Sequence, residues 1–261
     1  MNRALTALTA ACVALPCAAT QATVLLDFGP TAYAGTDSPG HEDGAATGTS
    51  WNSVTGDAAA GSLVDENGNA LPGVALDFGV GAVAAIDYAN GVRTDTRDHS
   101  AYPLWDSGVG EDHIFRDVAS EGPAIALAVT GLPQGVYDFY LTAFRGDNDT
   151  NASRNYDVYA TTSTAAVMDF SALGVGEITN TNPTTANDWI ADDHYVTGTF
   201  TITAAGEAFY VAVDSPGLAG DTNSPFIGVL SSLEIVVVPE PASAAFVALG
   251  LGAVARRPRR S

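Results

Sequence analysis

Two groups of residues have types and spacings that could do chemistry, and both fall between runs typical of β-strands. The first consists of Asp147, Asp149 and Asn151, which place oxygen ligands at alternate positions directly after a strand-like run. This is the spacing of the first half of a calcium-binding loop, but the second half is missing. A structural Ca²⁺ would therefore need a further loop, such as Asp192-Asp193. The alternative is a polar turn that joins two strands.

The second group is aromatic and lies within a long polar stretch, 88–123. We predict that Tyr102, Trp105 and Phe115 in this stretch bind a ligand. Aromatic rings stack on the apolar face of a sugar while nearby polar groups hold its hydroxyls. Polar neighbours of that kind are Asp98, His99, Asp112 and His113. The alternative is that the aromatic side chains hold this stretch against the rest of the domain.

The sequence carries none of the common catalytic motifs: no G-x-S-x-G elbow, no G-x-x-x-x-G-K-[ST] phosphate loop, no H-E-x-x-H helix and no zinc-type histidine spacing. Lysine is absent, which excludes Schiff-base mechanisms. Cys12 and Cys17 lie in the segment interpreted below as a signal peptide, which excludes thiol mechanisms in the mature protein. A carboxylate pair for glycoside hydrolysis stays open among 30 acidic residues. We assign no catalytic residue; in an enzyme, the acid-base candidates would be His99, Asp112 and His113.

The charge balance is strongly acidic, with 30 Asp and Glu residues against 10 arginines and a net charge of −20. Such a surface repels nucleic acid and anionic lipid headgroups, and it attracts divalent cations. We therefore expect no nucleic-acid partner. A saline habitat would favour the same acidity without any binding site.

The N-terminal residues 1–22 are typical of a secretory signal peptide. Arg3 is followed by an apolar run and then by small residues at Ala18-Ala19. Signal peptides have this order of basic, apolar and cleavage regions. Cleavage after Ala19 or after Ala22 would suit the small-residue preference, and either would release an exported protein.

The C-terminal residues 238–261 combine a turn, an apolar stretch and a basic stop. In order, they are Pro239, Glu240 and Pro241, then 242–255, then Arg256, Arg257, Arg259 and Arg260. As a helix, the apolar stretch would span about 21 Å, which is short of the roughly 30 Å hydrocarbon core. The arginines nevertheless indicate a transmembrane helix, because they hold that end in the cytoplasm and leave the preceding residues outside.

These features, together with the N-terminal signal, resemble the PEP-CTERM sorting signal of exported proteins of Gram-negative bacteria. The resemblance implies that a membrane protease, an exosortase, processes the tail, which is anchored in the inner membrane until then. It also implies a final place at the cell surface or outside the cell. Proteins with this signal are commonly associated with extracellular polysaccharide and biofilm.

Residues 23–237, between the two ends, are expected to form one all-β domain. Short alternating or β-branched runs recur between turn residues, and no helical pattern longer than two turns stands out. The runs are 24–28, 74–78, 82–87, 124–130, 136–144, 156–160, 197–203, 208–213 and 229–238. This pattern predicts a single antiparallel β-sandwich, in which the run at 136–144, apolar on both faces, is a central strand.

The turn and strand at 130–140, with the runs 26–29 and 228–235, resemble the galactose-binding-like jelly rolls, which bind sugars or accompany glycan-active enzymes. The resemblance implies a jelly-roll sandwich. A site is expected in the long polar stretches 30–72 and 88–123. We therefore predict a non-catalytic glycan-binding module at the cell surface. The alternatives are an enzyme acting on extracellular polysaccharide and a structural matrix protein without a ligand.

Overall fold

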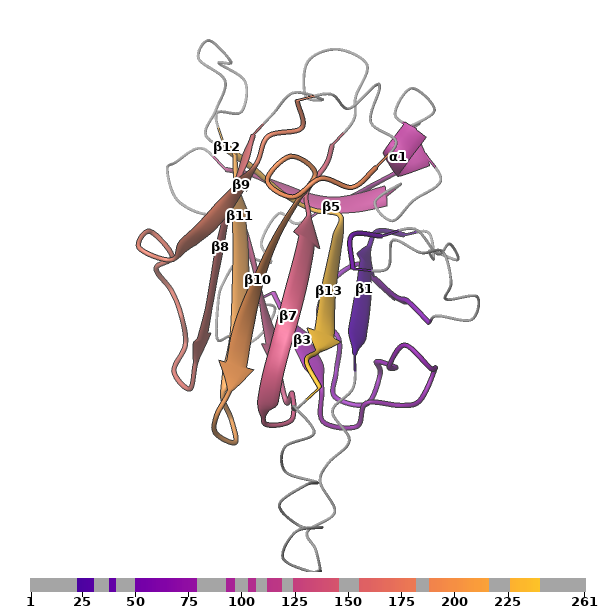
Figure 1. Ribbon diagram of the computed structural model, residues 1–261, viewed down its shortest axis with the longest axis vertical. Helices are drawn as coiled ribbons and strands as arrows, with labels where there is room; N and C mark the ends of the chain where they lie inside the picture. Colours follow the sequence, from indigo (N-terminus) through magenta and orange to yellow (C-terminus); the bar gives the residue numbers. More distant parts are fainter. Residues whose placement is uncertain are drawn as a thin grey trace, which may run out of the picture.

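The computed structural model describes residues 23–30, 38–40, 50–78, 93–96, 103–106, 112–118, 124–145, 155–181, 188–215 and 226–239. They form a sandwich of two five-stranded sheets, with a third, three-stranded sheet across one end (Figure 1). The one helix in these residues, α1 (Pro103–Asp106), is a single turn. The predicted all-β sandwich is confirmed.

Sheets A and B are the two layers of the sandwich. In spatial order, sheet A contains β10 (Tyr195–Ile202), β7 (Gly135–Thr142), β13 (Ser232–Val237), β1 (Val24–Phe28) and β2 (Asn52–Val54). Sheet B contains β3 (Ala75–Asp77), β6 (Ile125–Thr130), β11 (Ala208–Asp214), β8 (Tyr156–Ser163) and β9 (Gly174–Ile178). The third sheet contains β12 (Phe226–Leu230), β5 (Asp112–Val118) and β4 (Arg93–Thr96).

Eight of these strands have the connectivity of a jelly roll. Along the chain they are β1, β6, β7, β8, β9, β10, β11 and β13. The first pairs with the last, the second with the seventh, the third with the sixth and the fourth with the fifth, always antiparallel. This is one long hairpin rolled up so that alternate pairs fall in opposite sheets. Consequently the start of β1 and the end of β13 lie side by side at one end of the sandwich (Figure 1).

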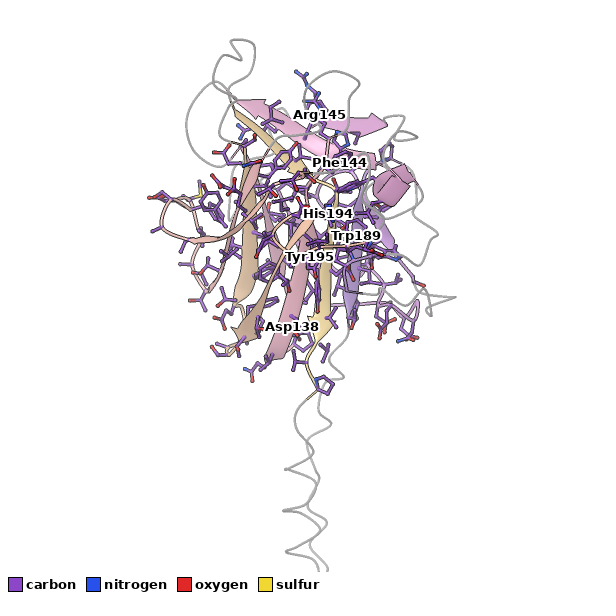
Figure 2. All side chains as sticks on the ribbon, turned by 45° about the horizontal axis from the view of Figure 1, so that its top comes forward. Asp138, Phe144, Arg145, Trp189, His194 and Tyr195 are labelled. Carbon is purple, nitrogen blue, oxygen red and sulfur yellow. The ribbon has the colours of Figure 1, made fainter. Side chains whose placement is uncertain are left out.

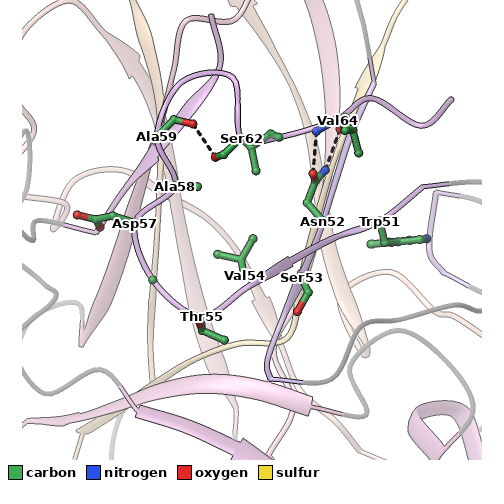
Figure 3. Close-up of a pocket in the computed structure, with 12 residues that line it drawn as sticks. Trp51, Asn52, Ser53, Val54, Thr55, Asp57, Ala58, Ala59, Ser62 and Val64 are labelled. Atoms are coloured by element: carbon green, nitrogen blue, oxygen red, sulfur yellow. Dashed lines mark hydrogen bonds between the residues drawn. The ribbon is translucent and has the colours of Figure 1, made fainter. Parts of the chain in front are cut away.

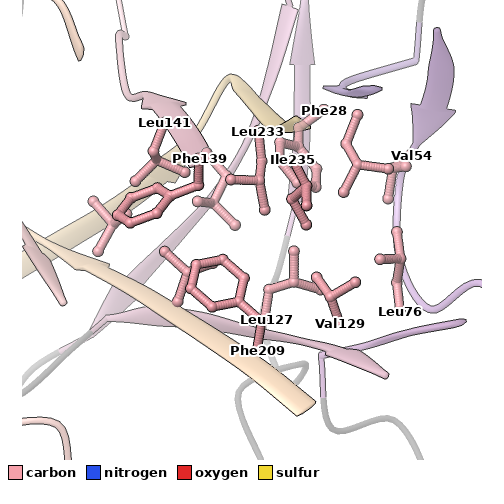
Figure 4. Packing of buried hydrophobic residues seen from close by; sticks show 14 of the residues in the cluster. Phe28, Val54, Leu76, Leu127, Val129, Phe139, Leu141, Phe209, Leu233 and Ile235 are labelled. Carbon is pink, nitrogen blue, oxygen red and sulfur yellow. The ribbon is translucent and has the colours of Figure 1, made fainter. Parts of the chain in front are cut away.

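Side chains that alternate along the strands build the core between the two sheets. In β7, Tyr137 and Phe139 are buried while Val136 faces outward. The strand lies between β10 and β13, so it is not at the edge of its sheet, as expected for a central strand. Phe139 packs against Phe209 of sheet B with ring centroids 5.3 Å apart (Figure 4). Phe200 of sheet A stacks on the same ring at 3.9 Å. Aromatic rings from both layers therefore hold the sheets together.

Most predicted strands are confirmed, as β1, β3, β6, β7, β8, β10 and β11; the run 82–87 lies outside the described residues. The prediction of one strand over 229–238 is wrong, because the chain bends at Ser231 and passes from the third sheet into sheet A. The buried Ser231 hydroxyl accepts a hydrogen bond from the backbone N–H of Phe144 (3.0 Å) and donates to its carbonyl (3.1 Å). These bonds satisfy backbone groups beside the bend.

The strands that the sequence reading missed are short or polar: β2, β4, β5 and β9. Two of them, β4 and β5, fall with α1 inside 88–123, which was expected to be a polar stretch without regular structure. In β5, the buried Ile114 and Phe115 have charged residues on both sides in the sequence. Because charged residues are depleted in strands, this segment did not look like a strand.

Candidate functional site

The segment 51–64 encloses a surface hollow of about 530 Å³ that includes β2 (Figure 3). Its lining residues include Ser53, Thr55 and Asp57, and the indole of Trp51 stands at one end (Figure 3). Small-ligand pockets commonly have volumes of about 300–1,000 Å³. The hollow therefore has room for a ligand of one or two sugar rings.

Two side chains hold the walls of the hollow in place. The amide of Asn52 donates to the carbonyls of Leu25 (3.0 Å) and Val64 (2.8 Å), and its oxygen accepts the N–H of Val64 (2.8 Å). The carboxylate of Asp57 accepts the N–H of Phe78 (2.8 Å). A site held in this way loses little conformational freedom when it binds, which favours affinity.

All three tryptophans of the chain gather around this end of sheet A. We call the aromatic cluster the group formed by Trp51, Leu104, Trp105, Phe144, Trp189 and Tyr195. Trp105 is fully buried at its centre, stacked on Phe144 with ring centroids 4.0 Å apart and edge-on to Trp189 at 5.8 Å. Figure 2 shows Phe144, Trp189 and Tyr195 near one another. Trp51 and Tyr195 are only partly buried, and Trp51 also lines the hollow.

The turn after the third tryptophan is fixed by Asp193 and His194. Asp193 accepts hydrogen bonds from the hydroxyl of Thr179 (2.9 Å) and the N–H of Thr181 (2.7 Å). Burial alone would raise the pKa of Asp193, but these hydrogen bonds outweigh it and lower the pKa below its usual value. Burial lowers the pKa of His194, which packs edge-on against Trp105 at 5.2 Å. The imidazole is therefore a neutral ring at neutral pH.

The outer face of sheet A buries polar groups next to the aromatic cluster. The hydroxyls of Thr142 and Ser232 are 2.7 Å apart, and both residues are fully buried. Glu234, also fully buried, accepts the N–H of Gly40 (3.0 Å). Asp27 is 3% exposed and lies directly across from Ser232 in the next strand. Hydrogen bonding thus accompanies burial on this face, as buried polar groups require.

The structure places two of the aromatic residues predicted to bind a ligand inside the protein. Trp105 is 0% exposed and Phe115 is 6% exposed, with the guanidinium of Arg145 lying 4.1 Å from the centroid of the Phe115 ring. His113, one of the acid-base candidates, is 0% exposed beside Phe115. Neither aromatic ring presents a face to solvent, so their position matches the alternative role of holding the stretch 88–123 to the sandwich.

The other predicted site residues lie mostly outside the described residues. These are Tyr102, the calcium-loop residues Asp147, Asp149 and Asn151, the motif residues Glu240 and Pro241, and Arg256, Arg257, Arg259 and Arg260. Pro239 is described and is exposed just beyond β13. Among the described residues, no three His, Cys, Asp or Glu side chains stand close enough to hold a metal ion. No helix in that same part of the chain is long and apolar enough to cross a membrane.

Sequence reasoning missed Trp51 and Trp189 as members of a common site. Each lies in a polar segment, far from the other and from Trp105 along the chain. A signal was present for Trp51, because it is the one tryptophan in the polar stretch 30–72, which was expected to carry a site. No spacing rule could have brought the three tryptophans together, because the jelly-roll connectivity does so.

No protein-family model matches this chain, and no curated protein matches its sequence. Solved structures with some likeness include xylanase 10C (mutant E385A) from Cellvibrio japonicus in complex with xylopentaose, at 11% identity and a TM-score of 0.29, covering 59% of this chain and 28% of that one. A second is the Agl-KA catalytic domain, at 14% identity and a TM-score of 0.27, covering 63% of this chain and 32% of that one. A third is the exo-β-1,3-galactanase from Phanerochaete chrysosporium with galactose, at 9% identity and a TM-score of 0.24, covering 56% of this chain and 26% of that one. The chain spans about a third or less of each, and likenesses this weak say nothing about activity.

Proposed function

We propose that this chain is an exported cell-surface protein that binds a glycan without acting on it, and that the hollow beside Trp51 is the binding site. The observation that carries the proposal is the pairing of a partly exposed indole with a hollow of about 530 Å³ whose lining residues include Ser53, Thr55 and Asp57. A sugar ring stacks its apolar face on an indole and places its hydroxyls against such groups.

The difference in exposure among the aromatic residues supports this site over the one predicted from the sequence. Trp105 and Phe144 are buried and stacked, so they form a rigid base. Trp51 and Tyr195 pack on that base while keeping part of their surface in solvent. A ring held from behind loses little entropy on binding, which favours stacking on a ligand.

The charge of the chain narrows the class of glycan. With a net charge of −20, the protein repels polyanionic polymers at low and moderate salt. We therefore propose a neutral polysaccharide as the ligand, in keeping with the extracellular polysaccharide implied by the sorting tail.

Export and sorting through a PEP-CTERM tail are part of the same proposal. The tail begins directly after β13, where Pro239 is exposed, and the domain begins beside it at the start of β1. Both ends therefore leave the sandwich on one side, away from the third sheet and α1 (Figure 1). If the tail is held in the inner membrane before exosortase processing, the end of the sandwich that carries the third sheet and α1 would point away from the membrane.

Glycan-array binding of the purified full-length protein tests the proposal. We expect selective retention of neutral glycans, and a loss of about tenfold in affinity, or about 1.4 kcal/mol, in the Trp51→Ala variant. Met168→Ala is the matched control, because it removes an apolar side chain that is 58% exposed and lies outside both the hollow and the aromatic cluster. Retention unchanged by Trp51→Ala would remove the hollow as the site, and retention of no glycan would favour a structural matrix role.

The enzymatic alternative is tested with the same protein. Of its three acid-base candidates, His113 is fully buried, while the side chains of His99 and Asp112 lie outside the described residues. Release of reducing ends from a retained polysaccharide, lost in a His113→Ala variant that still folds, would replace the binding proposal with an enzymatic one.

A further inference from the structure

Three carboxylates cross the outer face of sheet B in one row, which we call the acidic row: Asp214 of β11, Asp157 of β8 and Glu177 of β9. Asp157 is the direct cross-strand neighbour of both Asp214 and Glu177. Val213 and Val158, adjacent to them in sequence, belong to the core between the sheets. Because side chains alternate along a strand, the carboxylates face outward together.

Charges of one sign in such a row repel one another. Directly opposite residues have Cβ atoms about 4.5–5.5 Å apart, and like charges there are destabilising. Burial and the neighbouring Glu177 raise the pKa of Asp157. Burial and Asp157 raise the pKa of Asp214 to about 6. Burial, then Asp157 and Asp214, also raise the pKa of the Tyr159 phenol on the same face.

Asp214 gives a second observation, independent of the charge count. It is only 6% exposed, and its Oδ1 is buried without a hydrogen-bond partner among the described residues. Its carboxylate accepts one backbone hydrogen bond, from Ser215. Arg116 reaches this end of the sheet, but its guanidinium donates to the carbonyl of Ala124 (3.0 Å). A buried carboxylate oxygen is unfavourable unless a cation or a donor meets it.

We propose that the acidic row binds a divalent cation, held by Asp157 and Asp214 and completed by Glu177. All of its ligand atoms are carboxylate oxygens, which suit Ca²⁺ or Mg²⁺ rather than the nitrogen- and sulfur-preferring Zn²⁺. Ca²⁺ fits better, because it accepts irregular sets of oxygens that include bidentate carboxylates and water. The strongly acidic chain would concentrate such a cation near its surface.

One movement is required to form the site. As the side chains stand, no three acidic or histidine groups of the described chain are gathered at metal-ligand spacing. Glu177 is exposed and accepts a hydrogen bond from the amide of Asn155, which is also exposed (2.5 Å). A change of rotamer at Glu177 would turn its carboxylate toward Asp157, its neighbour in the row, at the cost of a solvent-exposed hydrogen bond.

This site is distinct from the calcium loop predicted from the sequence. The loop residues Asp147, Asp149 and Asn151 precede β8 in the chain, whereas the acidic row is built from β8, β9 and β11. It is also independent of the proposed glycan site, which lies in the segment 51–64. Failure of either proposal therefore leaves the other standing.

Thermal unfolding of the full-length protein at neutral pH, with EDTA or with millimolar CaCl2, tests the proposal. We expect CaCl2 to raise Tm of the unaltered protein by at least about 4 °C, since a ligand that binds only the folded state stabilises it. Asp214→Asn should raise Tm in EDTA, because it removes a buried charge and its repulsion with Asp157, and it should lose most of the calcium increment. Asp138→Asn, which removes an equal charge from the outer face of sheet A, should keep the full increment.

Calorimetric titration of the full-length protein with CaCl2 keeps the test decisive if the variant does not fold. No binding heat together with no Tm increment would overturn the proposal. A proton shared between Asp157 and Asp214 would then explain how the two neighbouring carboxylates are tolerated. A calcium increment that survives Asp214→Asn but disappears in Asp149→Asn would also overturn it, because the cation would then belong to the predicted loop.

Discussion

The outer faces of sheets A and B both bury carboxylates, and Glu234 of sheet A differs from Asp214 of sheet B in the groups that its oxygens meet. On sheet A, Glu234 is fully buried and accepts the N–H of Gly40 at 3.0 Å. On sheet B, Asp214 is almost as buried, yet its Oδ1 meets no donor among the described residues and its neighbour Asp157 carries the same charge. The N–H of Gly40 thus offsets part of the cost of burying Glu234, whereas the buried Oδ1 of Asp214 is the atom to which the proposed site assigns a cation.

The two faces also differ in what covers them. The aromatic cluster covers one end of sheet A with large rings, and polar hydroxyls lie beside it. On sheet B, Phe170 packs over small alanines, including Ala126 and Ala128, and the acidic row lies beyond them. On sheet A, Trp51 and Tyr195 of the aromatic cluster keep part of their surface in solvent, whereas on sheet B the acidic row places like charges side by side.

Trp105→Ala should give the largest change and would separate the structural half of the aromatic cluster from the binding half. The indole is 0% exposed and contacts Phe144, Trp189 and His194, so we expect a loss of about 3–5 kcal/mol in the free energy of unfolding, measured by urea denaturation. Trp51→Ala, at the partly exposed edge, should cost less than about 2 kcal/mol. Equal losses in the two variants would contradict this division.

Gly40→Ala tests how tightly sheet A holds its buried carboxylate. A Cβ at this position would stand 2.5 Å from Oε2 of Glu234 and 3.1 Å from Cδ2 of Tyr140. We expect a loss of about 1–3 kcal/mol, measured by thermal or urea unfolding, because the cover over Glu234 must shift. Gly56→Ala is the matched control, since nothing lies within 4 Å of its Cβ position. If both variants are equally stable, the cover over Glu234 is loose.

Asp214→Asn should change stability with the opposite sign and in a way that depends on pH. The pKa of Asp214 is raised to about 6 in the folded protein, so the folded state binds the proton more tightly than the unfolded chain. Its contribution to stability is therefore fully present below about pH 4 and is lost as the pH rises through about 6. After allowance for solvent screening, we expect the variant to be more stable by about 1 kcal/mol above that range.

The measurement is Tm against pH in EDTA for Asp214→Asn, for Asp138→Asn and for the unaltered protein. The advantage of Asp214→Asn should vanish toward pH 4, where the native carboxyl is protonated. An advantage that is the same at every pH would show that repulsion with Asp157 is not its cause.

The sequence was sufficient to predict the β-sandwich, but not the third sheet or the site. Short runs rich in apolar and β-branched residues, such as 24–28 and 208–213, identified the strands, and both of these strands are buried along their whole length. The bend at Ser231 was hidden, because strand-like apolar residues stand on both sides of the two serines at which the chain changes sheets. The aromatic cluster and the acidic row depend on which strands become neighbours, and that order follows from long-range pairing rather than from any local spacing.

Glu177→Gln should give the smallest change in stability, and it compares an exposed member of the acidic row with the buried Asp214. Glu177 belongs to the same row as Asp214 but is exposed, so water screens its charge. We expect the free energy of unfolding in EDTA to change by less than about 0.5 kcal/mol. The same variant should nevertheless weaken the calcium increment in Tm, because it removes a ligand oxygen. A large change in EDTA would mean that repulsion across the whole row, and not the burial of Asp214, sets sheet B apart from sheet A.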